Sequence, residues 1–95
     1  MNESYIKIAD ALNTLYELEN ELKISHFSPN ELKVFYTVIN LSAFHESGSN
    51  ISEVVQNSGM SRSTVYKTLK KLSNLNIICT FQSESDGRES LIKLL

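Results

Sequence analysis

The chain has 95 residues, of which 41% are hydrophobic and 21% are charged. This composition is typical of one soluble globular domain and excludes a disordered chain, and no apolar run approaches the ~20 residues that span a bilayer. The start Met1-Asn2-Glu3 resembles neither a signal peptide nor a transit sequence, so we expect a cytoplasmic protein without a membrane partner. One cysteine and two histidines cannot supply the four ligands of a structural zinc site, and we expect no metal and no cofactor.

The charges are distributed unevenly along the chain. Residues 1–60 hold three lysines and eight acidic residues, which give a net charge of −5. Residues 61–95 hold six basic and three acidic residues, which give +3, so that the whole chain carries −2. This asymmetry indicates that one face of a small acidic protein meets an anion.

The first predicted element is an amphipathic helix from Asn2 to about Lys23. Glu19 occupies the one position of the apolar stripe where an apolar residue is due, and the other stripe positions, at three- and four-residue spacings, are Tyr5, Ile8, Leu12, Leu15 and Leu22. Tyr16 and Leu18 widen the apolar face beyond a two-residue seam. The helix packs either on its own core or also on a partner chain. We therefore treat residues 1–25 as a candidate dimerisation element with those five apolar residues as the interface.

A second helix is predicted to start at Ser28-Pro29-Asn30-Glu31. Serine is a good cap, proline suits the first helical position, and glutamate can complete a capping box. The apolar positions nearly encircle the helix, which predicts a buried central helix that ends before Gly48; they are Leu32, Val34, Phe35, Val38, Ile39, Leu41 and Phe44. The next residues, 47–50, predict a short turn.

Two further helices joined by a tight turn are predicted to form a helix-turn-helix. The first spans Ile51–Ser58 with Ser52 as its cap, and Gly59 ends it. The second is capped by Ser61 and runs to about Leu75. We expect it to bury Val65, Leu69 and Leu72 and to point outward Arg62, Ser63, Tyr66, Lys67, Lys70 and Lys71.

The C-terminal part predicts a β-hairpin. Residues 77–82 and 90–95 are rich in strand-forming side chains, and the polar loop between them holds an Asp86-Gly87 turn. Cys79 is predicted to be a buried hydrophobic residue, with a redox sensor as the alternative. The predicted fold is therefore mainly α-helical with a small β-hairpin, in which residues 28–95 form one domain behind the N-terminal helix.

The second helix of the helix-turn-helix carries four positive charges and no negative one. At its start, several side chains can donate to base edges and phosphates in a major groove: Arg62, Ser63, Thr64, Tyr66 and Lys67. Each feature alone is typical of a solvated surface, whereas the glycine turn, the acid-free helix and the trailing hairpin together favour DNA binding. No phosphate-binding loop, paired-carboxylate site or nucleophile-base pair can be assembled from the sequence, so we expect that the protein is not an enzyme.

The segment from Ser61 to Leu72, followed by Asn76-Ile77-Ile78, resembles the recognition helix and first wing strand of winged helix-turn-helix regulators. Asp86-Gly87-Arg88 resembles the Asp-x-Arg wing motif of the MarR group, and TrmB-like and SarA-like regulators share much of this pattern. The resemblance covers about residues 28–95. It implies that the helix enters the major groove, that Arg88 reaches the minor groove and that a salt bridge from Asp86 orients Arg88. The implied DNA-binding residues are Ser61, Arg62, Ser63, Thr64, Tyr66, Lys67, Lys70, Lys71 and Arg88.

MarR-like chains continue past the wing into C-terminal helices that complete the dimer, whereas this sequence ends at Leu95 in the last predicted strand. We therefore expect the dimer to depend on the N-terminal helix, and a small-molecule effector is disfavoured but stays open. The expected function is that of a sequence-specific transcriptional regulator, by default a repressor, that binds a pseudo-palindrome in double-stranded DNA as a homodimer. The alternatives are an architectural, replication or plasmid-partition DNA-binding protein, and a winged-helix module that binds another protein.

Overall fold

The computed structural model describes residues 2–44, 48–82 and 90–95. Within these ranges the elements, in chain order, are α1 (Glu3–Glu21), α2 (Pro29–Phe44), β1 (Ser49–Asn50), α3 (Ile51–Ser58), α4 (Arg62–Asn74), β2 (Ile78–Gln82) and β3 (Ser90–Leu94). The three strands form one antiparallel sheet in the order β1-β3-β2. The predicted fold class, mainly α-helical with a small β-hairpin, is confirmed.

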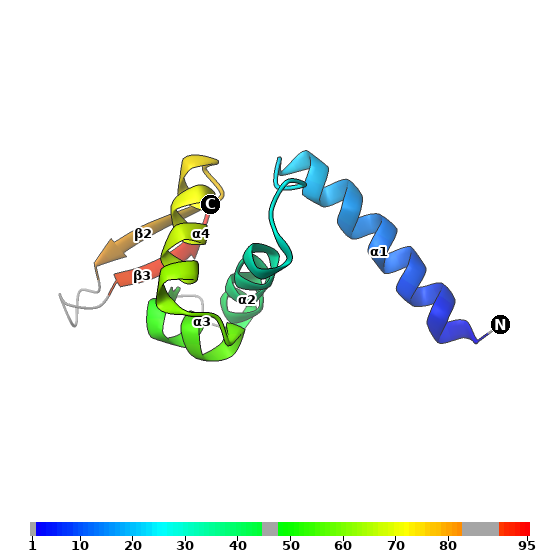
Figure 1. Ribbon diagram of the computed structural model, residues 1–95, viewed down its shortest axis with the longest axis horizontal. Helices are drawn as coiled ribbons and strands as arrows, with labels where there is room; N and C mark the ends of the chain where they lie inside the picture. Colours follow the sequence, from blue (N-terminus) through cyan, green and yellow to red (C-terminus); the bar gives the residue numbers. More distant parts are fainter. Residues whose placement is uncertain (1, 45–47, 83–89) are drawn as a thin grey trace.

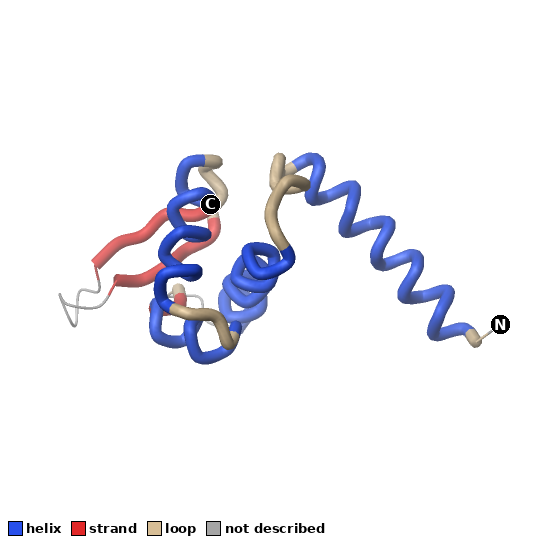
Figure 2. The backbone as a smooth tube through the Cα atoms, viewed as in Figure 1, coloured by secondary structure: helices blue, strands red, loops and turns tan. Residues whose placement is uncertain are grey.

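Helix α1 stands apart from the rest of the molecule, which gives the chain an elongated shape of 53 × 24 × 24 Å (Figure 1). Asn2 caps it by accepting a hydrogen bond from the Ser4 backbone N–H at 2.8 Å. No residue of α1 is buried. A single loop leads from its end to α2 (Figure 2), and Lys23 in that loop adopts a left-handed conformation with φ 63°.

Helix α2 lies at the centre of the remaining elements, as its encircling apolar pattern predicted. Val34, Phe35 and Val38 are buried on it. They meet buried side chains from the loop before α2, from α3 and α4, and from the sheet, namely Ile24, Phe27, Val54, Val65, Leu69, Leu72, Ile78 and Ile92. The core of the protein therefore begins only after α1 has ended.

The predicted capping box at Ser28 and Glu31 is confirmed, whereas the predicted cap of α3 is wrong. Asn50, not Ser52, caps α3: its side-chain oxygen accepts from the Glu53 N–H at 2.7 Å, and the Glu53 carboxylate accepts from the Asn50 N–H at 3.1 Å. A capping box needs a glutamate or glutamine three residues after the cap. Asn50 meets this requirement, and Ser52 does not because Val55 stands there.

Strand β1 replaces the turn that we predicted at residues 47–50. Ser49 pairs with Ile92 of β3, which adds a third strand to the predicted hairpin. Gly48 makes this pairing possible, because its φ is +96° and an added Cβ would stand 2.8 Å from the Ile92 carbonyl oxygen. Ser47, the first residue of that predicted turn, lies outside the described residues.

In the hairpin, Ile78 of β2 pairs with Leu94 of β3 and Cys79 pairs with Lys93. Side chains alternate between the two faces of a strand, and Ile78 faces the core. Cys79 consequently lies on the outer face and is only half-buried, so its predicted full burial is wrong. No helix in the described ranges is long and apolar enough to cross a membrane.

Candidate nucleic-acid interface

A glycine turn joins α3 to α4. Gly59 adopts a left-handed conformation with φ 71°, and its N–H donates to the Val55 carbonyl at 3.1 Å. Nothing lies within 4 Å of a Cβ built on Gly59, so the backbone conformation and not the space requires glycine here. The Met60 N–H then donates to the Ser58 hydroxyl at 3.2 Å, which fixes the direction in which α4 leaves the turn.

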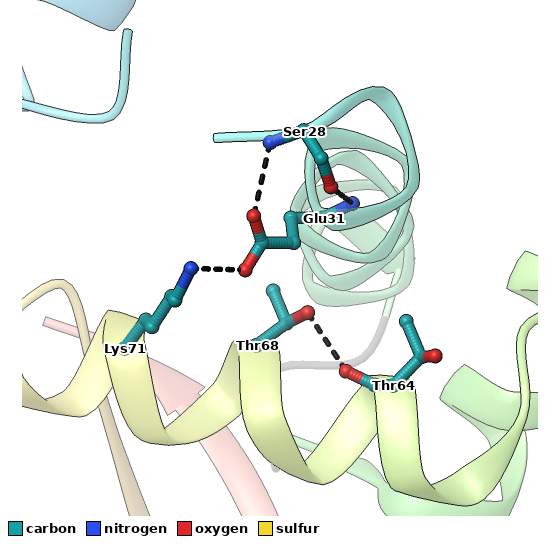
Figure 3. A network of polar contacts seen from close by, with 5 residues as sticks. All are labelled: Ser28, Glu31, Thr64, Thr68 and Lys71. Carbon is teal, nitrogen blue, oxygen red and sulfur yellow. Dashed lines mark hydrogen bonds and ion pairs between the residues drawn. The ribbon is translucent and has the colours of Figure 1, made fainter. Parts of the chain in front are cut away.

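Ser61 caps α4. Its hydroxyl oxygen accepts from the Thr64 N–H at 3.2 Å and lies 3.0 Å from the Thr64 hydroxyl. Thr68, which is fully buried, donates its hydroxyl to the Thr64 carbonyl at 2.8 Å, so the helix itself satisfies this polar group (Figure 3). The buried side of α4 consists of Val65, Thr68, Leu69 and Leu72.

The opposite side of α4 is exposed and cationic. Its exposed residues are Arg62, Ser63, Tyr66, Lys67, Lys70 and Asn74, and α4 contains no acidic residue. The Arg62 guanidinium donates to the Ser52 hydroxyl at 3.2 Å, which holds it beside the first turn of α3. Within the described part of the chain, Lys67 and Lys70 have no hydrogen-bond or ion-pair partner. This face therefore presents two unpaired ammonium groups and one guanidinium to the solvent.

Lys71 does not belong to this face, contrary to the predicted outward orientation. Its ammonium lies 2.5 Å from a carboxylate oxygen of Glu31 on α2 (Figure 3). The same ammonium lies 5.6 Å from the centre of the Phe27 ring. One residue along a helix is a rotation of about 100°, which carries Lys71 from the exposed side of Lys70 to the flank beside α2. The ion pair fastens the end of α4 to the start of α2.

The environment of Glu31 favours its charged form. The hydrogen bond from Lys71 and the hydrogen bond from the Ser28 backbone N–H lower the pKa of Glu31 to about 2 from its usual 4.5, against the opposing effect of burial. The same carboxylate therefore completes the capping box of α2 and forms an ion pair with Lys71 of α4. The Ser28-to-Glu31 spacing predicted the capping role of Glu31, and no local signal in the sequence points to its pairing with Lys71.

A second polar link joins α1 to α2 at Glu19, the residue that interrupts the apolar stripe. The Tyr36 hydroxyl donates to the Glu19 carboxylate. Burial, and then the bond to Glu19, raise the pKa of Tyr36 to about 12. The interruption of the stripe was the sequence signal for this contact, although the signal does not name Tyr36.

The other predicted site residues lie elsewhere. The stripe residues are exposed on α1 and its C-cap, and none of them lies on the basic face of α4: Tyr5, Ile8, Leu12, Leu15 and Leu22. Asp86 and Arg88 of the predicted wing motif lie outside the described residues. Two of the predicted DNA-binding residues, Tyr66 and Lys70, also line a hollow of about 240 Å³ between α4 and the sheet. The sequence did not single out the other lining residues as site residues: Ile51, Leu69, Ser73, Thr80 and Ser90.

Comparisons with known proteins agree with this geometry. Residues 22–86 match the family model of the sugar-specific transcriptional regulator TrmB. No curated protein matches the chain. Among solved structures, the PcaV transcriptional regulator from Streptomyces coelicolor, in complex with its natural ligand, is 22% identical with a TM-score of 0.62, over 93% of this chain and 60% of that one.

Two more solved structures show the same fold at lower identity. A variant of S. aureus MepR bound to an oligodeoxyribonucleotide is 17% identical with a TM-score of 0.64, over 100% of this chain and 67% of that one. The heme sensor protein PefR from Streptococcus agalactiae, in complex with heme, is 16% identical with a TM-score of 0.63, over 98% of this chain and 61% of that one. The chain thus spans between 60% and 67% of the length of these three structures. At these identities the likeness shows the winged-helix fold.

Proposed function

Because the chain belongs to the TrmB family of transcriptional regulators, we propose that it binds double-stranded DNA sequence-specifically, as a homodimer on a pseudo-palindromic operator. Repression by occlusion of a promoter is the proposed mode of regulation. The solved structure of MepR with an oligodeoxyribonucleotide supports DNA as the partner of a winged-helix chain of this shape.

The observation that carries the proposal is the exposed, acid-free face of α4. A major groove about 12 Å wide admits an α-helix, and the phosphates beside it attract cations. In the proposed complex Arg62, Ser63, Tyr66 and Lys67 read bases or hold the nearest phosphates. The hydroxyl groups of Ser61 and Thr64 are already engaged in the cap of α4. These two residues therefore contribute to DNA binding by holding the start of α4 in place.

The wing and Lys71 have different places in this proposal. As the resemblance to MarR-like wings implies, Arg88 enters the minor groove and Asp86 orients it. Lys71, which is paired with Glu31, keeps α4 at its angle to α2 instead of contacting DNA. Among the described residues of α4, the nonspecific electrostatic attraction to DNA phosphates therefore comes chiefly from Arg62, Lys67 and Lys70.

Helix α1 supports the homodimer. In proteins most of the stability of a helix comes from packing its apolar face, and no residue of α1 is buried against the rest of the chain. In the proposed dimer, a second copy of the chain packs along the stripe from Tyr5 to Leu22 and buries these exposed apolar side chains. Two-fold symmetry then presents two α4 helices to half-sites about one turn of DNA apart.

Selection from random-sequence duplex DNA at near-physiological salt tests the function, with the mass of the protein in solution measured alongside. We expect an enriched inverted repeat and a dimeric mass. The double variant R62A/K67A should lose at least tenfold in affinity for the enriched site, whereas Lys33→Ala, an exposed lysine on α2, should bind normally. A folded dimer that enriches no sequence, or equal affinities of the two variants, contradicts the proposal.

A further inference from the structure

The hollow between α4 and the sheet is built from residues that suit an oxyanion. Among the described residues, its polar lining comes from a lysine and from side chains that carry a hydroxyl group: Lys70, Tyr66, Ser73, Thr80 and Ser90. No carboxylate from the part of the chain that the structure describes lines it. The apolar side chains of Ile51 and Leu69 complete the wall and exclude part of the water.

The polar groups of the hollow are available for a ligand. Lys70, Tyr66, Ser73 and Thr80 have no side-chain hydrogen bond or ion pair to any residue in the described ranges. The Ser90 hydroxyl accepts a bond of 3.4 Å from the Gln82 amide and keeps its own proton to donate. These five side chains thus supply hydrogen-bond donors around one hollow, and the positive charge of Lys70 favours an anion over a cation there.

We infer that this hollow binds a phosphate group, and that in the complex this is a phosphodiester of the DNA backbone. A phosphate offers several acceptor oxygens and a negative charge, which match the hydroxyls and the ammonium of Lys70. The C-terminal end of α4 carries a partial negative charge that opposes an anion, and the full charge of Lys70 outweighs it. The volume of about 240 Å³ accommodates one such group and its bridging water.

The position of the hollow connects it to the proposed interface, and the inference rests on the proposed function. Tyr66, Lys70 and Ser73 follow one another at four- and three-residue spacings, so they continue the row that Arg62 begins on α4. Thr80 and Ser90 bring the second wall from β2 and β3. A DNA strand that lies along α4 therefore passes its backbone between the helix and the wing, and the bound phosphate sets how far α4 enters the groove.

A backbone contact carries no sequence information, which makes it distinguishable from base reading. Lys70→Gln should weaken binding to the selected operator and to an unrelated duplex by the same factor, at least fivefold. It should also lower the slope of log affinity against log salt concentration by about one. Thr80→Val should weaken both duplexes two- to threefold and leave the slope unchanged. Lys33→Gln is the matched control, since it removes an exposed lysine outside the hollow.

Two results overturn the inference. One is a Lys70→Gln protein with an unchanged salt slope, and the other is a Lys70→Gln protein that loses affinity for the operator alone, which would make Lys70 a base-reading residue. Circular dichroism and urea unfolding should show that the variants fold as the wild type does. Because Lys70 and Thr80 are exposed, their replacement leaves the core intact.

A titration with inorganic phosphate tests the hollow without DNA. We expect the backbone amide resonances of Ser73, Thr80 and Ser90 to shift in the wild type and to stay in place in Lys70→Gln. Phosphate shifts together with an unchanged salt slope of Lys70→Gln would assign the hollow to a free phosphorylated molecule and overturn the DNA source. A wild type that binds no duplex contradicts the proposed function, while absent phosphate shifts contradict the site itself.

Discussion

Helices α1 and α4 are both amphipathic, yet they bury their apolar faces to opposite extents. Helix α4 buries Val65, Thr68, Leu69 and Leu72, whereas α1 buries no residue at all. Their periodicities are equally clear in the sequence. The comparison teaches that helical spacing shows which face of a helix is apolar, and that the surface which covers this face has to come from the rest of the structure or from another chain.

The largest contrast is expected from leucine-to-alanine substitutions in the two helices. Leu72 is fully buried in the core, so Leu72→Ala leaves a cavity and should lower the free energy of unfolding by about 2–5 kcal/mol. Leu12→Ala removes a side chain that is 42% exposed and should cost under about 1 kcal/mol at protein concentrations where the chain is monomeric. Urea unfolding measures both. Equal losses would show that α1 packs on the core in solution.

A charge placed on each side of α1 tests whether a second copy covers the stripe. Leu12→Lys should raise the dissociation constant of the dimer about a hundredfold, or roughly 2.7 kcal/mol, because it buries an unpaired ammonium in the interface. Thr14→Lys adds the same charge on the opposite side of the helix and should change the constant less than threefold. Sedimentation over a range of concentrations gives both constants, and a similar response to the two variants would contradict the proposed interface.

The ion pair of Glu31 and Lys71 between α2 and α4 should contribute less to the free energy of unfolding than a core leucine does, and its contribution should depend on pH. The pKa of Glu31 is about 2 in the folded protein and near 4.5 in the unfolded chain, so its contribution is complete above pH 4.5 and is lost as the pH falls through 2. Since the side chain of Lys71 is 37% exposed and screened by solvent, we expect about 2 kcal/mol at pH 7.

Glu31→Gln should therefore be less stable than the wild type at pH 7 and approach it near pH 2. Urea unfolding at pH 7, 4.5, 3 and 2 follows this convergence. Glu17→Gln, which removes an exposed carboxylate of α1, serves as the control and should run parallel to the wild type. A difference between Glu31→Gln and wild type that stays constant across the series would mean that the ion pair does not stabilise the fold.

Local signals predicted most of the fold. Ser28, Glu31, Gly59 and Ser61 start or end helices through bonds that span three or four residues, and such bonds can be deduced from spacing alone. The failure to predict strand β1 has a different cause. The pairing of Ser49 with Ile92 joins segments far apart in the chain, and a two-residue strand has too few residues to show an alternating pattern.

The candidate site shows the same division. The exposed, basic face of α4 followed from helical periodicity and charge, whereas the pairing of Lys71 with Glu31 depends on how α2 crosses α4. The hollow also needs three separate segments, because Lys70, Thr80 and Ser90 meet only after the sheet has packed on α4. Orientation within one helix is predictable from sequence, and contacts between elements are not.

The smallest effect is expected at the polar link between α1 and α2. Tyr36→Phe removes the hydroxyl that donates to Glu19 and should cost about 1 kcal/mol, mostly as faster hydrogen exchange in the last turn of α1. Because the pKa of Tyr36 is raised to about 12, its contribution is complete below pH 10 and is lost as the pH rises through 12, which the ultraviolet absorbance of the phenolate can follow. The control is Tyr5→Phe, which removes an exposed hydroxyl at the other end of α1. If both variants leave exchange in the last turn unchanged, Glu19 does not hold α1 against α2, and the direction of α1 is set by the covering partner alone.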